Sequence, residues 1–240
     1  MKLCGYDFVK VGEFVGRYVE EITPVEGVID HMLAIVACRD TEYEVIVYGT
    51  YTMSSVKISA VNGGDDEFVV PVGPAQVMIA AHQLADAYYV RNVEVKGNDS
   101  SITIQTWPFT LRVVKAETED YMKAAKMALS LENDVDVQNV DLWSTKSLEK
   151  SIRERIKQAG GSIRRTDEMV VQLFGTVHVD LKKLYRVARA YKRSRVEEVY
   201  IRPTFGGNGI LIWGSPGGSV RLRTVIMGVQ NVPGSVRVQK

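Results

Sequence analysis

Two segments of the chain carry cations at the spacing of a single helical face. In residues 145–158 one set of lysines and arginines stands at i, i+4, i+7 and i+11, and the same intervals recur in residues 180–193. These intervals keep four side chains on one stripe of a helix. The first stripe consists of Lys146, Lys150, Arg153 and Lys157, and the second of Lys182, Arg186, Arg189 and Arg193.

Stripes of this kind are suited to neutralising a polyanion. Like charges at i, i+4 destabilise an isolated helix by about 0.2–0.5 kcal/mol per pair, so a stripe of cations points to an anionic partner. Duplex DNA carries one negative charge per about 1.7 Å of axis, and lysine and arginine neutralise it without reading the base sequence. The alternative interpretation is that both stripes are solvated helix faces.

The charge of the chain is divided unevenly along its length. The net charge is only +1, but residues 1–118 hold 9 basic and 16 acidic residues. Residues 119–240 hold 21 basic and 13 acidic residues, so the two parts carry −7 and +8. This asymmetry indicates either an anionic partner for the C-terminal part or a contact between the two parts.

No pattern in the sequence indicates catalysis or metal binding. The histidines His31, His82 and His178 lack metal-ligand spacing, and Cys4 and Cys38 fit no redox or metal motif. The glycine-rich segments 205–209 and 215–218 lie between predicted strands, which favours hairpin turns over phosphate loops. We therefore predict no catalytic residue, no metal ligand and no cofactor.

The composition is that of a globular protein with one large domain or two smaller ones. The chain has 240 residues, of which 45% are hydrophobic and 25% charged, so it can bury a substantial core. It contains no run of 18 apolar residues, and its first residues do not resemble a signal peptide. We expect a soluble, cytoplasmic protein that does not contact a membrane.

The N-terminal half is predicted to alternate between helices and groups of strands. Residues 6–11 are predicted as a strand, and apolar residues at helical spacing over 14–22 predict a helix that Pro24 ends. That helix is expected to expose Glu13, Arg17, Glu20 and Glu21. A second helix is predicted over residues 74–87, and strands at 32–37, 43–48, 56–61, 68–72, 93–95, 102–104 and 109–113.

The C-terminal half repeats this order of elements. Residues 177–179 predict a strand, Asp180 can cap the helix that follows, and strands are predicted around 199–201, 210–212 and 220–222. Val72 then aligns with Val179 and Leu111 with Leu222, an offset that drifts only from 107 to 111. This is an internal repeat of a βαβββ unit in an α+β protein.

The repeat predicts two domains per chain. Domain 1 covers residues 1–117, a linker covers 118–134, and domain 2 covers 135–240. The first unit of domain 2 is shortened. About 50 residues, 23–72, separate the two predicted helices of domain 1, whereas only about 20, 158–180, separate those of domain 2, which is too few for the same number of strands.

The repeated unit resembles the DNA sliding clamps, which include the bacterial DNA polymerase III beta subunit, proliferating cell nuclear antigen and the phage clamps. Three parts of the sequence carry the likeness: Met32–Ala60, Phe68–Tyr121 and Ile210–Met227. The resemblance implies a DNA-clamp (processivity) fold in which helices line a central channel. It also implies a ring of six domains, so a two-domain chain would form a homotrimer.

The resemblance further implies a role in DNA replication as a processivity factor. The ring would encircle duplex DNA without sequence preference, tether the replicative DNA polymerase and work with a clamp loader. A phage source fits the length of the chain. In beta-type clamps a partner peptide enters a pocket near the last strand, and the matching positions are Val225 and Met227, with Tyr121 from the linker side. These apolar residues could instead simply fill the core.

Two other readings of the sequence stay open. A clamp-fold accessory protein or decoy that does not close into a ring would account for the shortened unit. An enzyme or small-ligand module with coincidental repeats would require a nucleophile near His178 in space.

Overall fold

The computed structural model describes most of the chain. The described residues are 1–26, 33–39, 41–49, 51–62, 67–78, 91–98, 100–106, 109–115, 140–162, 169–175, 177–204 and 207–229. Residues 118–134, the predicted linker, and His31, His82 and Tyr121 lie outside them.

The order of the elements confirms an α+β fold built from repeated βαβββ units. The helices are α1 (Gly5–Glu26), α4 (Thr145–Gln158) and α5 (Leu181–Arg193), and residues 74–78 are also helical. The strands of the first half are β1 (Lys2–Cys4), β2 (Leu33–Arg39), β3 (Glu42–Tyr48), β4 (Thr52–Asn62), β5 (Phe68–Val72), β6 (Asn92–Asn98), β7 (Ser101–Thr106) and β8 (Phe109–Val114). Those of the second half are β9 (Asp141–Ser144), β10 (Val170–Leu173), β11 (Val177–Asp180), β12 (Glu198–Pro203), β13 (Gly209–Gly214) and β14 (Arg221–Met227).

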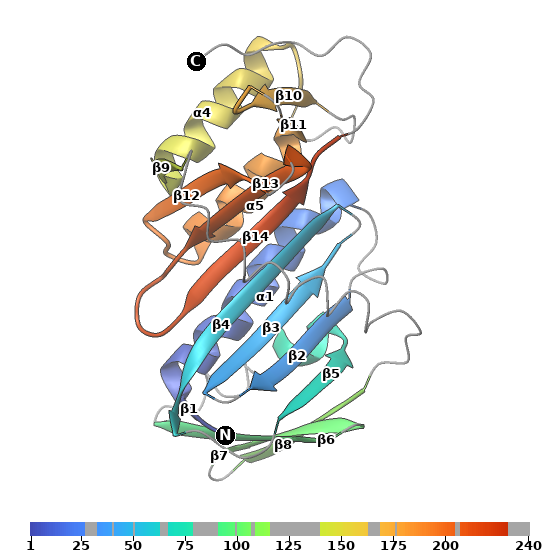
Figure 1. The fold of residues 1–240 in the computed structure, drawn as a ribbon, viewed down its shortest axis with the longest axis vertical. Helices are drawn as coiled ribbons and strands as arrows, with labels where there is room; N and C mark the ends of the chain where they lie inside the picture. Colours follow the sequence, from blue (N-terminus) through green and yellow to red (C-terminus); the bar gives the residue numbers. More distant parts are fainter. Residues whose placement is uncertain are drawn as a thin grey trace.

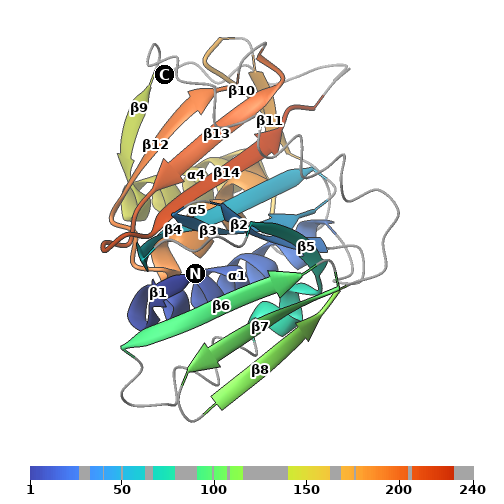
Figure 2. The same ribbon diagram turned by 60° about the horizontal axis from the view of Figure 1, so that its bottom comes forward.

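One antiparallel sheet runs through both halves of the chain. Its strand order is β8-β7-β6-β1-β4-β14-β13-β12-β9, and β3, β2 and β5 branch from β4. The halves join where β4 pairs with β14, with Val56 opposite Leu222 and Thr52 opposite Ile226. Figures 1 and 2 show β8 and β9 at opposite ends of the molecule. Strands β10 and β11 form a separate two-stranded sheet.

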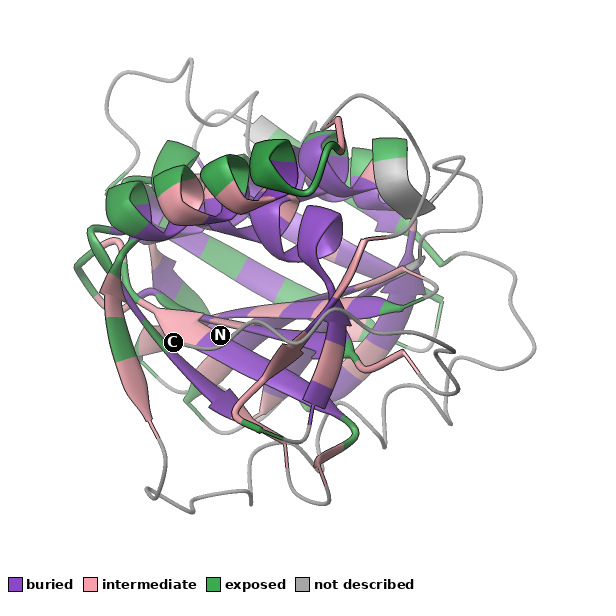
Figure 3. Cartoon of the chain, turned by 90° about the horizontal axis from the view of Figure 1, so that it is seen from above, coloured by how far each residue is buried: buried purple, intermediate pink, exposed green. Residues whose placement is uncertain are grey.

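The helices cover one face of this sheet and enclose the core against it (Figure 3). Buried phenols hold the two layers together. The Tyr18 hydroxyl of α1 donates to Thr52 Oγ1 at 2.7 Å, and the Tyr191 hydroxyl of α5 donates to the Ile212 carbonyl at 3.2 Å. Burial raises the pKa of Tyr191, so its hydroxyl stays protonated and remains a donor.

Helix α1 begins earlier than the sequence predicts. Residues 6–11, predicted as a strand, form its first turns, because Phe8 and Val11 continue the buried helical period of Val15 and Ile22. A six-residue segment with apolar residues at 6, 8, 9 and 11 fits both the period of a strand and that of a helix, so sequence alone could not separate them. The first strand of the unit is therefore β1.

Pro24 does not end α1, which continues to Glu26. A proline in the last turn removes only one backbone hydrogen bond, and the helix has few residues left to lose. The Thr23 hydroxyl donates to the Val19 carbonyl at 2.7 Å beside it, which keeps this turn hydrogen-bonded.

The unit that begins with β9 differs from the others. In the described residues the unit that contains α4 has one strand after its helix, β10. The units that contain α1 and α5 each have three strands after the helix, β2–β4 and β12–β14. The sequence predicts this shortage. The exact domain limits, residues 1–117 and 135–240, stay predictions.

The turn between β13 and β14 binds the start of α1. The Asp7 carboxylate accepts hydrogen bonds from Ser219 N at 3.3 Å and Ser219 Oγ at 2.7 Å. Lys10 Nζ donates to the carbonyls of Pro216 and Gly217 at 3.3 and 3.1 Å. These contacts add a second attachment between the two halves, at the opposite end of α1 from Glu26.

Gly218→Ala is expected to destabilise the protein more than Gly217→Ala. Both glycines have positive φ, +73° and +87°, where any other residue costs about 1–2 kcal/mol. A Cβ on Gly218 would also lie 2.5 Å from Asp7 Oδ1, whereas one on Gly217 meets nothing within 4 Å. Displacing Asp7 adds about 1–3 kcal/mol. Urea unfolding of both variants measures the difference in the free energy of unfolding. Equal losses would contradict a stabilising contact between this turn and Asp7.

Candidate nucleic-acid interface

Helix α4 presents its basic stripe to solvent, as the sequence predicts. Ser144 caps the helix by accepting a hydrogen bond from Ser147 N at 3.1 Å. The apolar side chains Leu148, Ile152 and Ile156 are buried against the sheet, so the opposite face is open. That face carries the exposed residues Lys146, Lys150, Arg153 and Lys157.

The cations of α4 have few acidic partners. Lys150 stands 3.9 Å from Glu154, with 77% of its side chain exposed, and such an exposed pair contributes little to stability. Within the described part of the chain, no ion pair involves Lys146, Arg153 or Lys157. Their positive charge is therefore available to an anion from solution.

Helix α5 is more basic but less open. It has six lysines and arginines and no acidic residue, and Asp180 caps it by accepting from Lys182 N at 2.9 Å. The whole first turn is buried, and Lys182 is only 1% exposed, so the predicted stripe of four loses its first member. Helical spacing placed Lys182 on the stripe but could not reveal what packs over that turn. The residues that reach the surface are Arg186, Arg189, Lys192 and Arg193.

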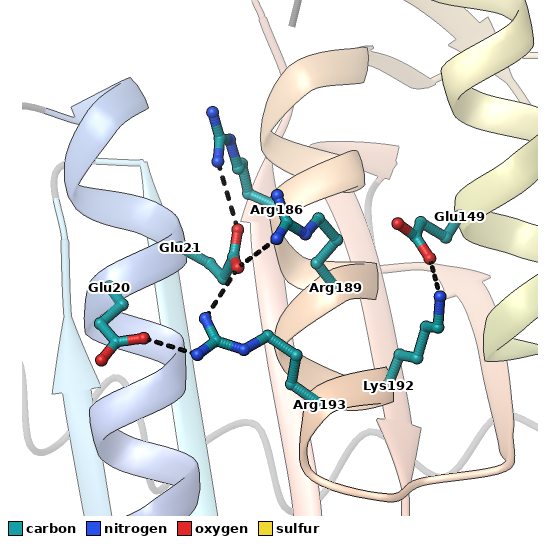
Figure 4. A network of polar contacts seen from close by, with 7 residues as sticks. All are labelled: Glu20, Glu21, Glu149, Arg186, Arg189, Lys192 and Arg193. Carbon is teal, nitrogen blue, oxygen red and sulfur yellow. Dashed lines mark hydrogen bonds and ion pairs between the residues drawn. The ribbon is translucent and has the colours of Figure 1, made fainter. Parts of the chain in front are cut away.

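Glu21 of α1 lies at the centre of the contact between α1 and α5. Its carboxylate is 3.3 Å from Arg186, 3.3 Å from Arg189 and 3.0 Å from Arg193 (Figure 4). Only 4% of its side chain is exposed, so the prediction that it is exposed beside Glu20 is wrong. The reason is that α5 packs alongside α1 and its arginines cover the carboxylate.

Glu20 and Glu149 complete this arrangement. Arg193 also pairs with Glu20 at 2.9 Å, and Lys192 pairs with Glu149 of α4 on the other side of α5. Hydrogen bonding to Glu21 raises the pKa of Arg193. Each surface cation of α5 thus has a carboxylate partner on a neighbouring helix.

A hollow of about 530 Å³ lies between α4 and α5. Its lining includes one carboxylate, from Glu149, and the ring of Tyr185, with the Arg189 guanidinium 5.8 Å from that ring. The other lining residues are the cations Arg153, Arg186, Arg189, Lys192 and Arg193. A phosphate group fits this chemistry, because guanidinium and ammonium donors bind phosphate oxygens by charge-assisted hydrogen bonds.

The predicted pocket residues lie on the other face of the sheet. Val225 is buried opposite Met53 of β4, and Met227 is 38% exposed. Met227 N donates to the Tyr51 carbonyl at 2.8 Å, and Lys183 Nζ of α5 stands 4.0 Å from the centre of the Tyr51 ring. Sequence reasoning missed Tyr51 and Met53, because only the pairing of β4 with β14 brings them to this strand.

The sheet has three strands that pair on one side only in the described residues. Of these strands, β8 ends the first half and β9 ends the second, and β5, which pairs with β2 alone, is the third. Leu111 of β8 and Trp143 of β9 are both partly buried at the margins of the core. Leu142 of β9, on the opposite face, is 54% exposed.

The remaining sequence observations give no second site. Among the described residues no group of three histidine, cysteine, aspartate or glutamate side chains could hold a metal ion. His178 uses its backbone carbonyl to accept a hydrogen bond from Val229 N at 2.8 Å. No helix in the described part of the chain has the length and apolar character that a membrane span requires.

The comparison with solved structures identifies the fold. No family model matches the sequence, and no curated protein matches it in sequence either. The fold is similar to a DNA polymerase sliding clamp from Pseudomonas aeruginosa, with a TM-score of 0.64 and 10% identity over 96% of this chain and 66% of that one. It is also similar to a DNA polymerase III beta subunit from Thermotoga maritima, with a TM-score of 0.59 and 10% identity over 97% of this chain and 65% of that one. A DNA polymerase III beta chain from Streptococcus pneumoniae gives a TM-score of 0.58 and 12% identity over 96% of this chain and 64% of that one.

The chain therefore has the DNA sliding-clamp fold. It spans 64–66% of the length of these three clamp chains. The identities of 10–12% establish the architecture, and they leave the activity of this chain to be argued from its own residues.

Proposed function

We propose that this protein is a DNA sliding clamp, a ring that encircles duplex DNA and tethers a DNA polymerase to it. The observation that carries the proposal is the exposed cationic face of α4, beside the paired cations of α5, on the helix side of a sliding-clamp fold. In this fold family the helices line the channel, which would place the cations of α4 around the duplex.

The proposed grip on DNA is electrostatic and independent of sequence. Lysines and arginines on α4 contact phosphates, which position a protein on the duplex without reading bases. The part of the helix face near α1 adds little attraction for DNA, because this helix has five acidic and two basic residues. Weak contacts of this kind let a topologically closed ring slide.

The proposed ring is a homotrimer that closes through sheet edges. An unpaired edge strand is a liability unless it is covered, and head-to-tail pairing of β8 with β9 of the next copy would cover both. Leu111 and Trp143 would then complete one continuous core across the joint. A phage origin, a clamp loader as partner and residence in the host cytoplasm belong to the same proposal.

The proposed partner site lies beside the end of β14. A polymerase peptide with aliphatic and aromatic anchors would contact Met227 and Val225 from one half and Tyr51 from the other. Methionine suits such a wall because its unbranched, polarizable side chain adapts to different ligands.

The short unit formed by β9, α4 and β10 favours a second candidate function. A clamp-fold accessory protein that does not close would need fewer strands in this unit. The mass of the protein in solution separates the two functions, because only the first requires a stable trimer.

Reversing two charges on α4, Lys146→Glu with Lys150→Glu, is expected to weaken retention on duplex DNA. The plot of log K against log salt should lose about 0.9 of slope for each phosphate contact removed. A salt series on a labelled duplex measures this. The matched control is Lys2→Glu with Lys96→Glu, which makes the same charge change on the far face of the sheet; equal losses in both proteins would rule out the α4 face.

Leu142→Lys is expected to convert the trimer, three times 26.8 kDa, to a monomer. A lysine on an edge strand opposes pairing with another chain. Light scattering after size exclusion measures the mass. Val61→Lys is the control, because Val61 is similarly exposed, at 56% against 54%, on a strand that is already paired. A wild-type monomer at micromolar concentration would instead support the second candidate function.

Met227→Ala and Tyr51→Ala are each expected to weaken binding of a polymerase-derived clamp-binding peptide by about 1 kcal/mol or more, as truncated binding hot spots do. Fluorescence titration of the peptide measures the change, with Val61→Ala as the control. Unchanged affinity in folded Met227→Ala protein would place the peptide elsewhere.

A further inference from the structure

The outward cations of α5 are already paired with carboxylates within the chain. Its three arginines share one carboxylate, that of Glu21, and Lys192 pairs with Glu149. The exposed cations of α4 are not paired in this way. Arg153, for example, lines the hollow between α4 and α5 and has no acidic partner in the described part of the chain. Two basic helices on one face therefore offer DNA different amounts of charge.

We propose that Glu21 sets how tightly the helix face holds DNA, by occupying Arg186, Arg189 and Arg193 in place of phosphate. This inference rests on the proposed function and concerns the same face. It assigns α4 as the helix that carries the contacts and α5 as a helix whose arginines are held back.

The geometry of Glu21 makes it an effective competitor for phosphate. Its carboxylate is carried by α1, whose buried residues pack against the sheet, so it needs no further ordering to meet the arginines. The pair with Arg186 is also sheltered, since the exposed fraction of the side chain is 4% for Glu21 and 14% for Arg186, whereas Arg189 and Arg193 are more open, at 35% and 43%. Salt screens a partly buried pair less than it screens contacts between exposed lysines and a duplex.

The consequence suits a protein that must slide. If all the cations of α4 and α5 bound phosphates, the grip would rise steeply, because each contact adds about 0.9 to the salt slope. Keeping three arginines on an internal carboxylate limits the grip while leaving the face positive.

The first test is Glu21→Gln, which keeps the shape of the side chain and removes its charge. The probes are a linear duplex in fluorescence anisotropy and heparin, a polyanion that is not DNA. The variant should bind both more tightly than wild type. Between about 50 and 200 mM salt, its loss of affinity should increase about threefold for each arginine released, which concerns Arg186 and Arg189, because Arg193 keeps its pair with Glu20.

Glu13→Gln is the matched control for the first test. It removes the same charge from the same helix, at an exposed pair with Arg17 of 3.2 Å. If Glu21→Gln gains no more affinity than Glu13→Gln for either polyanion, the inference is overturned.

The second test does not depend on the folding of a Glu21 variant. Arg189→Gln and Arg153→Gln each remove one arginine from the same hollow. If Glu21 holds Arg189 back, Arg189→Gln should bind the duplex like wild type. Arg153→Gln should bind more weakly at low salt, and its affinity should fall about threefold less than that of wild type between about 50 and 200 mM salt. Equal losses would overturn the inference.

These outcomes separate the inference from the proposed function. If Arg153→Gln and the α4 reversal leave duplex binding unchanged, the proposed DNA face fails. The heparin titration of Glu21→Gln then still decides whether the carboxylate withholds the arginines.

Discussion

The pairing of β4 with β14 is the contact on which the other features of the molecule depend. It joins strands from the two halves and continues as a buried hydrogen bond of 2.8 Å between Ser54 and Thr224. The Tyr191 hydroxyl lies 3.0 Å from the same Thr224 oxygen, which ties α5 to this seam. Because the sheet is continuous there, α1 and α5 must pack side by side on one face, and this brings Glu21 among the arginines.

The same contact explains the uneven charge along the chain. Excess acid in the first half and excess base in the second left two explanations open, an anionic partner or a contact between the halves. The structure shows the contact, in the pairs that Glu20 and Glu21 make with α5. It does not consume all of the positive charge, since the exposed cations of α4 remain on the same face. Both explanations therefore have residues that support them.

The two faces of the molecule have different chemistry. The helix face is charged and suited to a polyanion. The sheet face is apolar at one end of the seam, where Met53, Val225 and Met227 are neighbours, and charged further along it, at Lys57 and Arg221. Helix α5 touches both regions, because its arginines reach the helix face and Lys183 lies over the Tyr51 ring. The ring that we propose, with DNA inside and partners outside, would use this division.

The sequence by itself determined the repeated βαβββ order, the limits of α4, the cap at Asp180 and the open basic stripe of α4. These features follow from periodicity and capping, which are local. Only the tertiary structure decided that Lys182 and Glu21 are buried and that Tyr51 lies beside Met227. A helical period tells which residues share a face, but it cannot tell which distant element covers that face. That depends on pairing between strands far apart in the chain.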